Sequence, residues 1–259
     1  MNIFNAFILG IVEGVTEFLP ISSTYHLIYT AKILGISDSE FLKLFEVTIQ
    51  SGAILAVFLL YLKDMIKNRL LIQKVLASFL PTATIGFLLY KMIKNVFFEA
   101  DTLITGAFII IGLIFIVTEK MVKNELFAPK KSLSSLSYKD ALKIGLLQSL
   151  SVIPGVSRAG IVILGMLVMG YKRDEAAYYS FFLAIPTIFA ASIFDLYKNK
   201  EILFYSANNL TCLATGFATA CIFAYLSMRW LIIYLKKHSL FPFGIYRIIA
   251  GSGIIFFMR

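Results

Sequence analysis

Long runs of apolar residues, separated by short polar loops, make up most of the chain. A bilayer core of roughly 30 Å requires about 20 apolar residues in each spanning helix. Several runs reach or approach this length. The pattern therefore predicts membrane-spanning helices at residues 45–62, 75–92, 102–118, 178–197, 208–228 and 243–258.

Two further apolar stretches, residues 3–31 and 141–170, are interrupted near their middle. Pro20 breaks the first stretch and Pro154 breaks the second, because a proline disfavours helical geometry in the residue before it. Each resulting half is too short to cross a bilayer. Broken helices at membrane depth are tolerated where protein or a water-filled cavity surrounds them. We therefore expect a re-entrant helical hairpin at each stretch.

The two interrupted stretches also resemble each other in sequence. Residues 6–13 align with residues 141–148 at an offset of 135 positions. A slip of one residue then aligns the proline and a serine of both stretches, Pro20 with Pro154 and Ser23 with Ser157. We interpret this resemblance as an internal repeat.

One hairpin and three spanning helices give each half an odd number of crossings, so the second half would lie inverted relative to the first. The chain is therefore predicted to be an all-α polytopic membrane protein with a single domain, residues 1–259. It would be an inverted repeat of two halves, 1–118 and 141–259, joined by a linker at 119–140. Each half would contain one re-entrant hairpin and three transmembrane helices.

Basic residues gather in the polar loops at 63–74, 119–140 and 229–238. In the inverted arrangement these loops lie on one side of the membrane, and the positive-inside rule makes that side the cytoplasm. Residues 31–44 and 93–101 would then lie outside. The first hairpin would enter the membrane from outside and the second from inside.

The composition supports the membrane class. The chain is 59% hydrophobic and 15% charged, with a mean hydropathy of +0.85, which excludes an ordinary soluble domain. A net charge of +9 would also suit a nucleic-acid-binding protein, but the basic residues lie between the apolar runs, as in the cytoplasmic loops of membrane proteins. We expect membrane lipid as a partner and no nucleic acid. The sequence leaves open whether the chain forms a homo-oligomer.

Two glutamates, Glu13 and Glu17, lie in the first hairpin on one helix face. A carboxylate inside a bilayer is costly and usually pairs, faces a polar interior or has a function. Two of them repel unless a cation, an arginine or a shared proton relieves the repulsion. We predict that both are catalytic and bind a divalent cation, Mg or Ca. The alternative is a solvated helix end.

Hydroxyl groups and a histidine follow Pro20. Ser22, Ser23 and Thr24 are suited to cap the next helix, and His26 lies in its first turn. A helix N-terminus presents unpaired N–H groups that favour an anion. The pattern predicts that Ser22 and Thr24 bind substrate, and Ser23 lies between them in the same hydroxyl cluster. Taken alone, His26 could be a core histidine bonded to a carbonyl, but beside two glutamates and a serine cluster we predict a catalytic or phosphate-contacting role for it.

The second hairpin repeats this arrangement with different chemistry. Gly155 permits a tight turn, and Ser157 and Arg158 begin the following helix. Arginine suits phosphate because its planar fork donates two parallel hydrogen bonds. We predict that all three bind substrate and that Arg158 is also catalytic. The alternative for Arg158 is a snorkelling or structurally paired side chain.

Together the hairpins offer carboxylates, hydroxyls, a histidine, an arginine and two helix N-termini. This set suits phosphoryl transfer, where catalysis consists mainly of positioning and charge stabilisation. A transporter or flippase of a lipid phosphate would use the same groups and is the alternative function. A simple anion channel would have little use for paired glutamates.

Two segments of the chain carry a family resemblance. Residues 13–24 with His26, and residues 154–158, resemble the two motifs of the bacterial undecaprenyl-diphosphatase family, also called bacitracin-resistance proteins. The resemblance covers essentially the whole chain, because similar family stretches also match residues 45–50, 180–186 and 241–247.

The resemblance implies hydrolysis of undecaprenyl diphosphate to undecaprenyl phosphate and inorganic phosphate. This reaction recycles the lipid carrier of cell-wall precursors at the outer face of the bacterial plasma (inner) membrane. It also implies residue roles: metal binding or general base for Glu13 and Glu17, nucleophile for Ser23, acid or base for His26, and phosphate binding for Ser157 and Arg158. Whether serine, histidine or water attacks stays open. The family fold resembles the predicted two-hairpin repeat.

Three positions depart from the family pattern. Ala159 and Val162 stand where the second motif usually has hydroxyl residues, and Tyr25 stands where the first usually has glycine. Two lost hydrogen bonds of about 1 kcal/mol each would weaken substrate positioning. We therefore expect reduced activity or a preference for another polyprenyl diphosphate.

Overall fold

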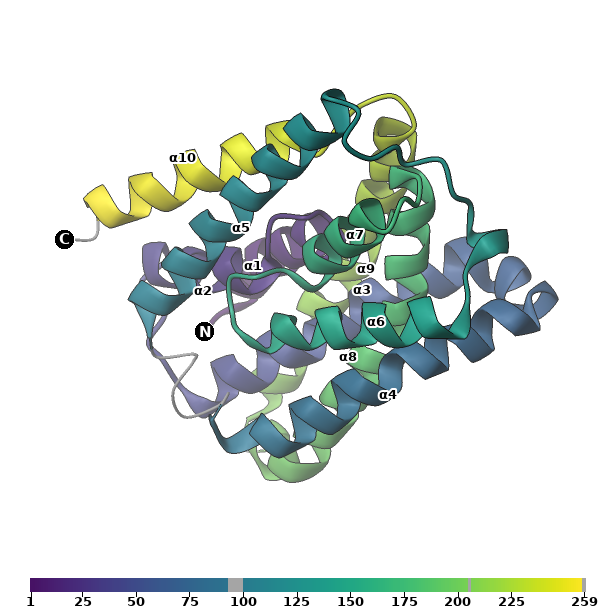
Figure 1. Ribbon diagram of the computed structural model, residues 1–259. Helices are drawn as coiled ribbons and strands as arrows, with labels where there is room; N and C mark the ends of the chain where they lie inside the picture. Colours follow the sequence, from purple (N-terminus) through teal and green to yellow (C-terminus); the bar gives the residue numbers. More distant parts are fainter. Residues whose placement is uncertain (93–99, 205, 258–259) are drawn as a thin grey trace.

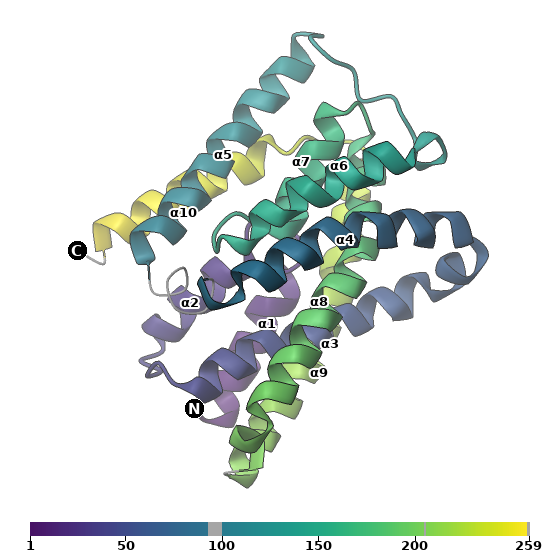
Figure 2. The same cartoon turned by 60° about the horizontal axis from the view of Figure 1, so that its bottom comes forward.

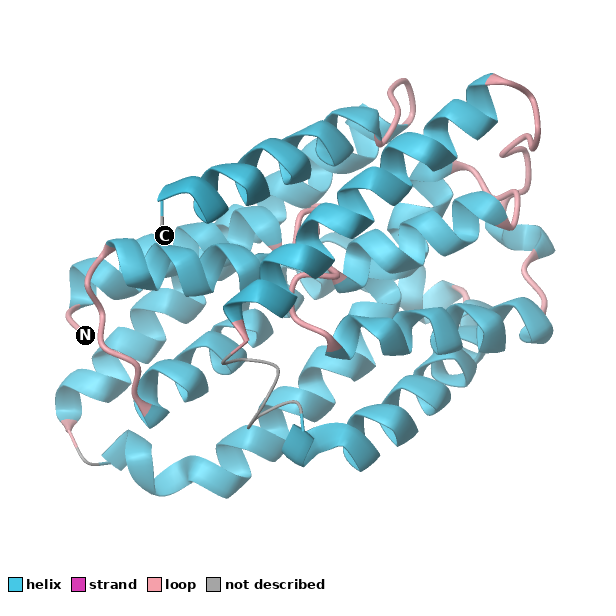
Figure 3. Ribbon diagram, turned by 60° about the vertical axis from the view of Figure 1, so that its left-hand side comes forward, coloured by secondary structure: helices cyan, strands magenta, loops and turns pink. Residues whose placement is uncertain are grey.

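The computed structural model describes residues 1–92, 100–204 and 206–257, which form helices and their connecting loops (Figure 3). These residues contain no β-strand, and one isolated β-bridge joins Lys131 to Tyr171. The predicted all-α class is confirmed. Most of the loop predicted at 93–101 lies outside the described residues.

Five helices of the described chain are long and apolar enough to cross a membrane. Each lies where a span was predicted and extends beyond it at one or both ends. The sixth predicted span forms a helix of 17 residues, at the lower end of the spanning range. These helices are α3 (Glu40–Lys67), α4 (Arg69–Met92), α5 (Asp101–Lys123), α8 (Arg173–Phe204), α9 (Ala207–Leu235) and the shorter α10 (Phe241–Phe257).

Both interrupted stretches form broken helical hairpins, as predicted. Their helices contain 11 to 14 residues, or about 21 Å at most with a rise of 1.5 Å per residue, which is too short to cross a bilayer. The first hairpin consists of α1 (Ile3–Thr16) and α2 (Ser23–Ile33). The second consists of α6 (Tyr138–Gln148), the short 3-10 helix η3 (Ser149–Val152) and α7 (Arg158–Val168), while η2 (Leu133–Ser135) lies in the linker before it.

The helices of the two halves pack against each other reciprocally. The first helix of each hairpin lies against the second long helix of the other half: α1 against α9, and α6 against α4. The third long helices, α5 and α10, run side by side (Figures 1 and 2). This exchange of partners agrees with a repeat. The inverted orientation of the halves and their boundary at the linker stay predictions.

Glycine permits the close approach of both hairpins to their partner helices. A Cβ atom at Gly10 of α1 would lie 2.7 Å from the carbonyl oxygen of Gly216 on α9. At Gly145 of α6 it would lie 2.0 Å from the carbonyl oxygen of Ser78 on α4. Gly10 and Gly145 are equivalent in the sequence repeat, so both halves use the same position for the same contact.

The three basic loops gather toward one end of the bundle, at the upper right of Figure 1. There the N–H of Lys131 in the linker donates to the carbonyl of Gly170 (2.8 Å). The buried carboxylate of Glu119 pairs with Arg173 and accepts the backbone N–H of Leu240. These contacts tie the 119–140 linker, the start of α8 and the α9–α10 connection together at that end of the bundle.

Candidate active site

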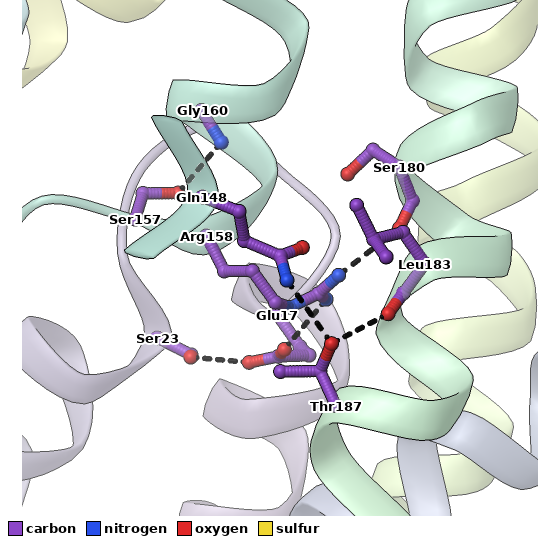
Figure 4. Close-up of polar contacts among 9 residues, drawn as sticks. All are labelled: Glu17, Ser23, Gln148, Ser157, Arg158, Gly160, Ser180, Leu183 and Thr187. Atoms are coloured by element: carbon purple, nitrogen blue, oxygen red, sulfur yellow. Dashed lines mark hydrogen bonds and ion pairs between the residues drawn. The ribbon is translucent and has the colours of Figure 1, made fainter. Parts of the chain in front are cut away.

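The turns of the two hairpins meet at a buried cluster of polar side chains. Glu17 follows the last residue of α1, and its Oε2 accepts a hydrogen bond from Ser23 Oγ at 2.5 Å. Its other oxygen, Oε1, accepts from Arg158 Nη2 at 2.9 Å, across 141 positions of sequence. The side chains of Glu17 and Arg158 are only 6% and 9% exposed. The fold thus joins the predicted carboxylate to the predicted arginine (Figure 4).

Arg158 is held from three sides. Besides Glu17, its guanidinium donates from Nη1 to the carbonyl oxygen of Ser180 on α8 (3.0 Å) and lies over the ring of Phe18. Its Nε atom is buried without a hydrogen-bond partner, as is the hydroxyl oxygen of Ser180. A buried unpaired donor costs about 1–3 kcal/mol. The site therefore retains unused donors beside the ion pair, which an anionic ligand would satisfy.

The two turns share an unusual backbone conformation at their capping serines. Ser22 has φ 67° and ψ 97°, and Ser157 has φ 75° and ψ 113°. A non-glycine residue in this left-handed region is strained and depends on its surroundings to stay there. Each serine Oγ accepts a backbone N–H of the next helical turn, from Tyr25 (3.4 Å) and Gly160 (3.1 Å).

This equivalence corrects the predicted alignment of the turns. The backbone pairs Ser22 with Ser157, so the alignment of Ser23 with Ser157 is wrong by one residue. The offset of 135 continues through the turn without a slip, and Ser23 is equivalent to Arg158. The matching prolines misled the alignment, because proline marks a turn without fixing its length.

A cavity of about 570 Å³ lies beside the cluster. Its polar lining includes Glu17 and residues at or just before the start of α2 and α7, namely Ser22, Ser23, Thr24, Gly155, Ser157 and Arg158, together with Lys43, Gln50, Thr82, Ser151, Thr187 and Asp195. The remaining wall is largely apolar and comes mainly from α4 and α8, including Phe79, Ala83, Phe87, Ile188, Ala191 and Phe194. Seven of the nine residues predicted to form the site therefore line one cavity.

The other two predicted residues lie outside the cavity lining. Glu13 is fully buried one turn before Glu17, and neither of its carboxylate oxygens has a hydrogen-bond partner in the described part of the chain. His26 faces α10 instead. Its Nδ1 lies 2.8 Å from the carbonyl oxygen of Ser22, and its Nε2 lies 2.6 Å from Tyr246 Oη.

The polar wall of the cavity includes residues that the sequence did not single out. Gln148 on α6 donates from Nε2 to Thr82 Oγ1 (3.0 Å) and to Thr187 Oγ1 (3.1 Å), and both threonines line the cavity (Figure 4 shows Gln148 and Thr187). Gln50 on α3 also lines it. The sequence contained a signal for Gln148, since it aligns with Glu13 in the repeat. The threonines gave none, because they look like ordinary residues of spanning helices.

The departures from the family pattern lie away from the cavity. Ala159 and Val162 are fully buried in α7 and do not line it. Tyr25 is buried against Phe108 of α5, with ring centroids 3.7 Å apart, and donates to the carbonyl oxygen of Ala250 on α10 (3.3 Å). The expectation that the missing hydroxyls weaken substrate contacts is therefore unsupported by their placement.

The residues present could bind a divalent cation only if the phosphates of a bound substrate supplied further oxygen ligands. Among the described residues, no group of three or more His, Cys, Asp or Glu side chains is arranged to hold a metal ion. Glu17 is already engaged by Ser23 and Arg158, whereas both oxygens of Glu13 are buried without a partner. Magnesium is often held by one or two carboxylates together with substrate phosphates. Glu13 is the carboxylate left for such an arrangement, and it lies one helical turn from the cavity lining.

A buried carboxylate–hydroxyl–arginine cluster at the end of an apolar-walled cavity defines a class of protein. Helices of spanning length place this cluster inside a multi-pass membrane protein. The polar end suits an anionic group and the apolar wall suits a hydrocarbon chain. The chain thus has the features of a membrane protein that acts on lipids with anionic head groups.

Comparison with known proteins identifies the family. Residues 6–253 match the family described as Bacitracin resistance protein BacA, and the chain belongs to this family. It is 44% identical to the undecaprenyl-diphosphatase of Wolinella succinogenes over 258 residues, covering 100% of this chain and 99% of the relative. The enzymes of the same name from Aquifex aeolicus (45% identity, 97% and 96% covered) and Persephonella marina (43% identity, 100% of both chains) are similar along their whole length.

Proposed function

We propose that this protein hydrolyses undecaprenyl diphosphate to undecaprenyl phosphate and inorganic phosphate, and so recycles the lipid carrier of cell-wall precursors. The full-length similarity to proteins named undecaprenyl-diphosphatase supports this reaction. The observation that carries the proposal is the contact of Glu17 with both Ser23 and Arg158 at the cavity. In this proposal Ser23 is the nucleophile, Glu17 its base and Arg158 the phosphate-binding cation, and their contacts support these roles.

Ser23 is the nucleophile in this proposal. A hydroxyl bonded to a carboxylate that a third group orients is the usual sign of an activated nucleophile. Ser23 Oγ attacks the terminal phosphorus and Glu17 takes its proton, while the bond from that phosphorus to the bridging oxygen breaks. Undecaprenyl phosphate leaves, and the phosphoryl group stays on Ser23. Water then attacks the phosphorus, the bond to Oγ breaks, and the proton returns from Glu17 to Ser23.

The phosphate groups bind between the two helix N-termini. Arg158 stabilises the charge on the phosphoryl oxygens. The phosphate competes with the Glu17 carboxylate for the Arg158 guanidinium. The first-turn N–H groups of α2 and α7 favour an anion. Ser22, Thr24, Gly155 and Ser157 line the cavity where these helices begin, which supports their role in substrate binding.

The apolar wall between α4 and α8 receives the polyprenyl chain. Phe79 and Phe87 from α4 and Ile188 and Phe194 from α8 contribute to this wall. Burial of apolar surface contributes about 25 cal/mol per Å², so a long chain adds affinity without specific contacts. A lipid substrate is therefore favoured over a soluble diphosphate.

A divalent cation, Mg or Ca, would be held by Glu13, one helical turn before Glu17, together with substrate phosphates. Such a cation would neutralise phosphate charge during the reaction. Removal of divalent cations with EDTA should lower the rate, and Glu13→Gln should abolish the response to re-added Mg or Ca. A rate that is unchanged by EDTA would contradict this assignment.

His26 acts by holding the turn in its strained conformation. Its ring is fixed between the carbonyl of Ser22 and the hydroxyl of Tyr246, on which it also stacks. It does not line the cavity. An acid–base role would give the pH dependence of kcat a step that disappears in His26→Gln, whereas a positioning role would lower kcat without changing the profile. We expect the second outcome.

The active site faces the outside of the bacterial plasma (inner) membrane. The basic loops lie at one end of the bundle, and the cavity lining runs along α3, α4 and α8 toward their opposite ends. Basic loops prefer the cytoplasm, which supports an outward-facing cavity. Cysteine labelling in intact cells should modify position 37 and spare position 130; the reverse pattern would overturn this orientation.

The test of the reaction is phosphate release from undecaprenyl diphosphate by the purified protein. Release by the wild type and its loss in Glu17→Gln would support hydrolysis. The same vesicle-reconstituted protein should be assayed for movement of undecaprenyl phosphate between leaflets, because a transporter or flippase is the alternative. Lipid movement without phosphate release, by folded protein with Mg or Ca present, would overturn the proposal.

A further inference from the structure

Arg247 on α10 is an arginine with no exposed surface, and the mechanism above does not use it. Within the described residues, the Arg247 guanidinium donates four hydrogen bonds, and every acceptor is a backbone carbonyl oxygen. Nη1 donates to Pro20 (3.1 Å), Nη2 to Gly155 (2.5 Å) and Val156 (3.3 Å), and Nε to Phe108 (2.9 Å). One side chain therefore bonds directly to the turns of both hairpins.

The carbonyls that Arg247 joins are equivalent in the repeat. Pro20 and Gly155 lie 135 positions apart, the same offset that relates the two capping serines. Each of these carbonyls stands two residues before its capping serine, where the backbone is strained. Such a conformation persists only where surrounding contacts hold it. Arg247 supplies the same kind of contact to both strained turns.

The surroundings leave room for a single guanidinium. Gly112 on α5 lies directly against Arg247. A Cβ atom at Gly112 would lie only 2.9 Å from Cβ of Arg247, so a second large side chain does not fit there. The rings of Phe108 and Phe115 lie 4.5 Å and 5.7 Å from the guanidinium carbon, within the range of cation–π contact.

Arg247 is not placed to bind substrate. It does not line the cavity, and four of its five N–H groups are used by the four carbonyls. Its effect on the reaction must pass through the turns. These turns carry Ser23 on one side and Arg158 on the other, each one residue after its strained capping serine.

We propose that Arg247 is a positioning residue that fixes the separation of the two hairpin turns, and with it the alignment of Ser23 and Glu17 with Arg158. The kinetic part of this inference rests on the proposed hydrolysis. A displacement of about 1 Å at reacting groups costs on the order of 10²-fold in rate. Loss of Arg247 should therefore act on kcat more than on the binding of the lipid chain.

The first test compares kinetic constants of purified variants. Arg247→Met keeps the length but removes every donor, and we expect kcat to fall about 100-fold with KM changed less than about threefold. Arg247→Lys keeps the charge but not the planar fork, and should lose about tenfold. The matched control is Arg229→Met, which changes an exposed arginine on α9 and should leave kcat unchanged.

The second test measures the hairpins themselves and does not depend on activity. Spin labels at Ile33→Cys on α2 and Leu150→Cys in η3, both exposed, report the distance between hairpins once Cys212 and Cys221 are replaced by serine. The distance distribution should broaden or shift in Arg247→Met and stay unchanged in Arg229→Met. If Arg247→Met does not fold, Arg247→Lys takes its place in both tests.

The two measurements separate the possible failures. Folded Arg247 variants with wild-type kcat and an unchanged distance distribution would overturn the inference. Lower thermal stability alone, with kcat and distances unchanged, would also overturn it, because that is the result of a purely structural role. A wild type that releases no phosphate would refute the proposed function, while the distance measurement would still test the positioning of the turns.

Discussion

The two hairpins follow the same backbone path through their turns but present opposite charges there. Ser22 and Ser157 have matching left-handed conformations and cap the following helices in the same way. The next residue is Ser23 in one hairpin and Arg158 in the other. One helix position thus presents a hydroxyl beside a carboxylate in the first half and a cation in the second.

Because of this difference, the buried charge of each hairpin is paired by the other hairpin. A buried charge is costly unless it is paired, and Glu17 and Arg158 are each nearly buried. Their ion pair crosses the contact between the hairpins, so each charge is tolerated because the other hairpin supplies its partner. A duplicated backbone with two identical turns would place like charges together. The two turns share a backbone path but carry different side chains, so together they form a single asymmetric site.

The difference between the two hairpin turns is tested most strongly by replacing Ser23 and Ser157, the two serines that the sequence alignment had paired. Ser23→Ala should lower kcat at least on the order of 10⁴-fold, because it removes the proposed nucleophile. Ser157→Ala should lower the stability by about 1 kcal/mol through loss of a helix cap and reduce kcat/KM by no more than about tenfold. Phosphate release measures the activity of each variant, and thermal unfolding measures its stability. Equal losses in the two variants would contradict the division of roles.

Arg158 provides the next largest effect. Arg158→Ala should reduce kcat/KM by about 10²–10³-fold, because it removes the donor for the phosphoryl oxygens and leaves Glu17 buried without its cation. Arg158→Lys should recover part of the loss, since it restores charge without the bidentate fork. Steady-state kinetics measure both variants, with exposed Arg69 changed to Ala as the control. Wild-type kinetics in Arg158→Ala would remove the second hairpin from the mechanism.

Adding a methyl group where each hairpin packs against its partner helix should have a smaller effect, which we expect on stability. Gly145→Ala and Gly10→Ala both place a methyl group against a partner helix, and overpacking of this kind costs about 1–3 kcal/mol. The cost should be larger at Gly145, where the nearest backbone atom would be 2.0 Å away rather than 2.7 Å. Thermal unfolding in detergent measures the difference. Gly106→Ala is the control, because nothing lies within 4 Å of its added Cβ.

The smallest effect is expected from restoring the family hydroxyls. Ala159→Ser and Val162→Thr should change kcat/KM by less than about threefold, because both positions are buried away from the cavity. Each variant should be slightly less stable, since a hydroxyl enters a packed apolar site. A gain in activity of tenfold or more in the double variant would show that these positions govern substrate contacts after all.

Local patterns were enough to pick out most of the residues that meet at the cavity. Prolines and serines after apolar half-helices marked the two turns, and isolated ionisable residues in apolar surroundings marked Glu13, Glu17 and Arg158. These signals are reliable because a bilayer penalises unpaired charge and broken helices wherever they lack a purpose. The alignment of the turns failed by one residue, since the length of a turn depends on backbone angles that the residue types do not specify.

The tertiary structure decided which of these groups meet. The helical class, the two broken hairpins and the carboxylates, hydroxyls and arginine in them could all be predicted from the residue pattern, because hydrophobic periodicity and helix breaks are local properties. The residue pattern did not determine that His26 faces α10, that Glu13 lies behind the cavity, or that Arg247 joins both turns. Those placements depend on how helices distant in the sequence pack, with close approaches at glycines such as Gly10 and Gly145.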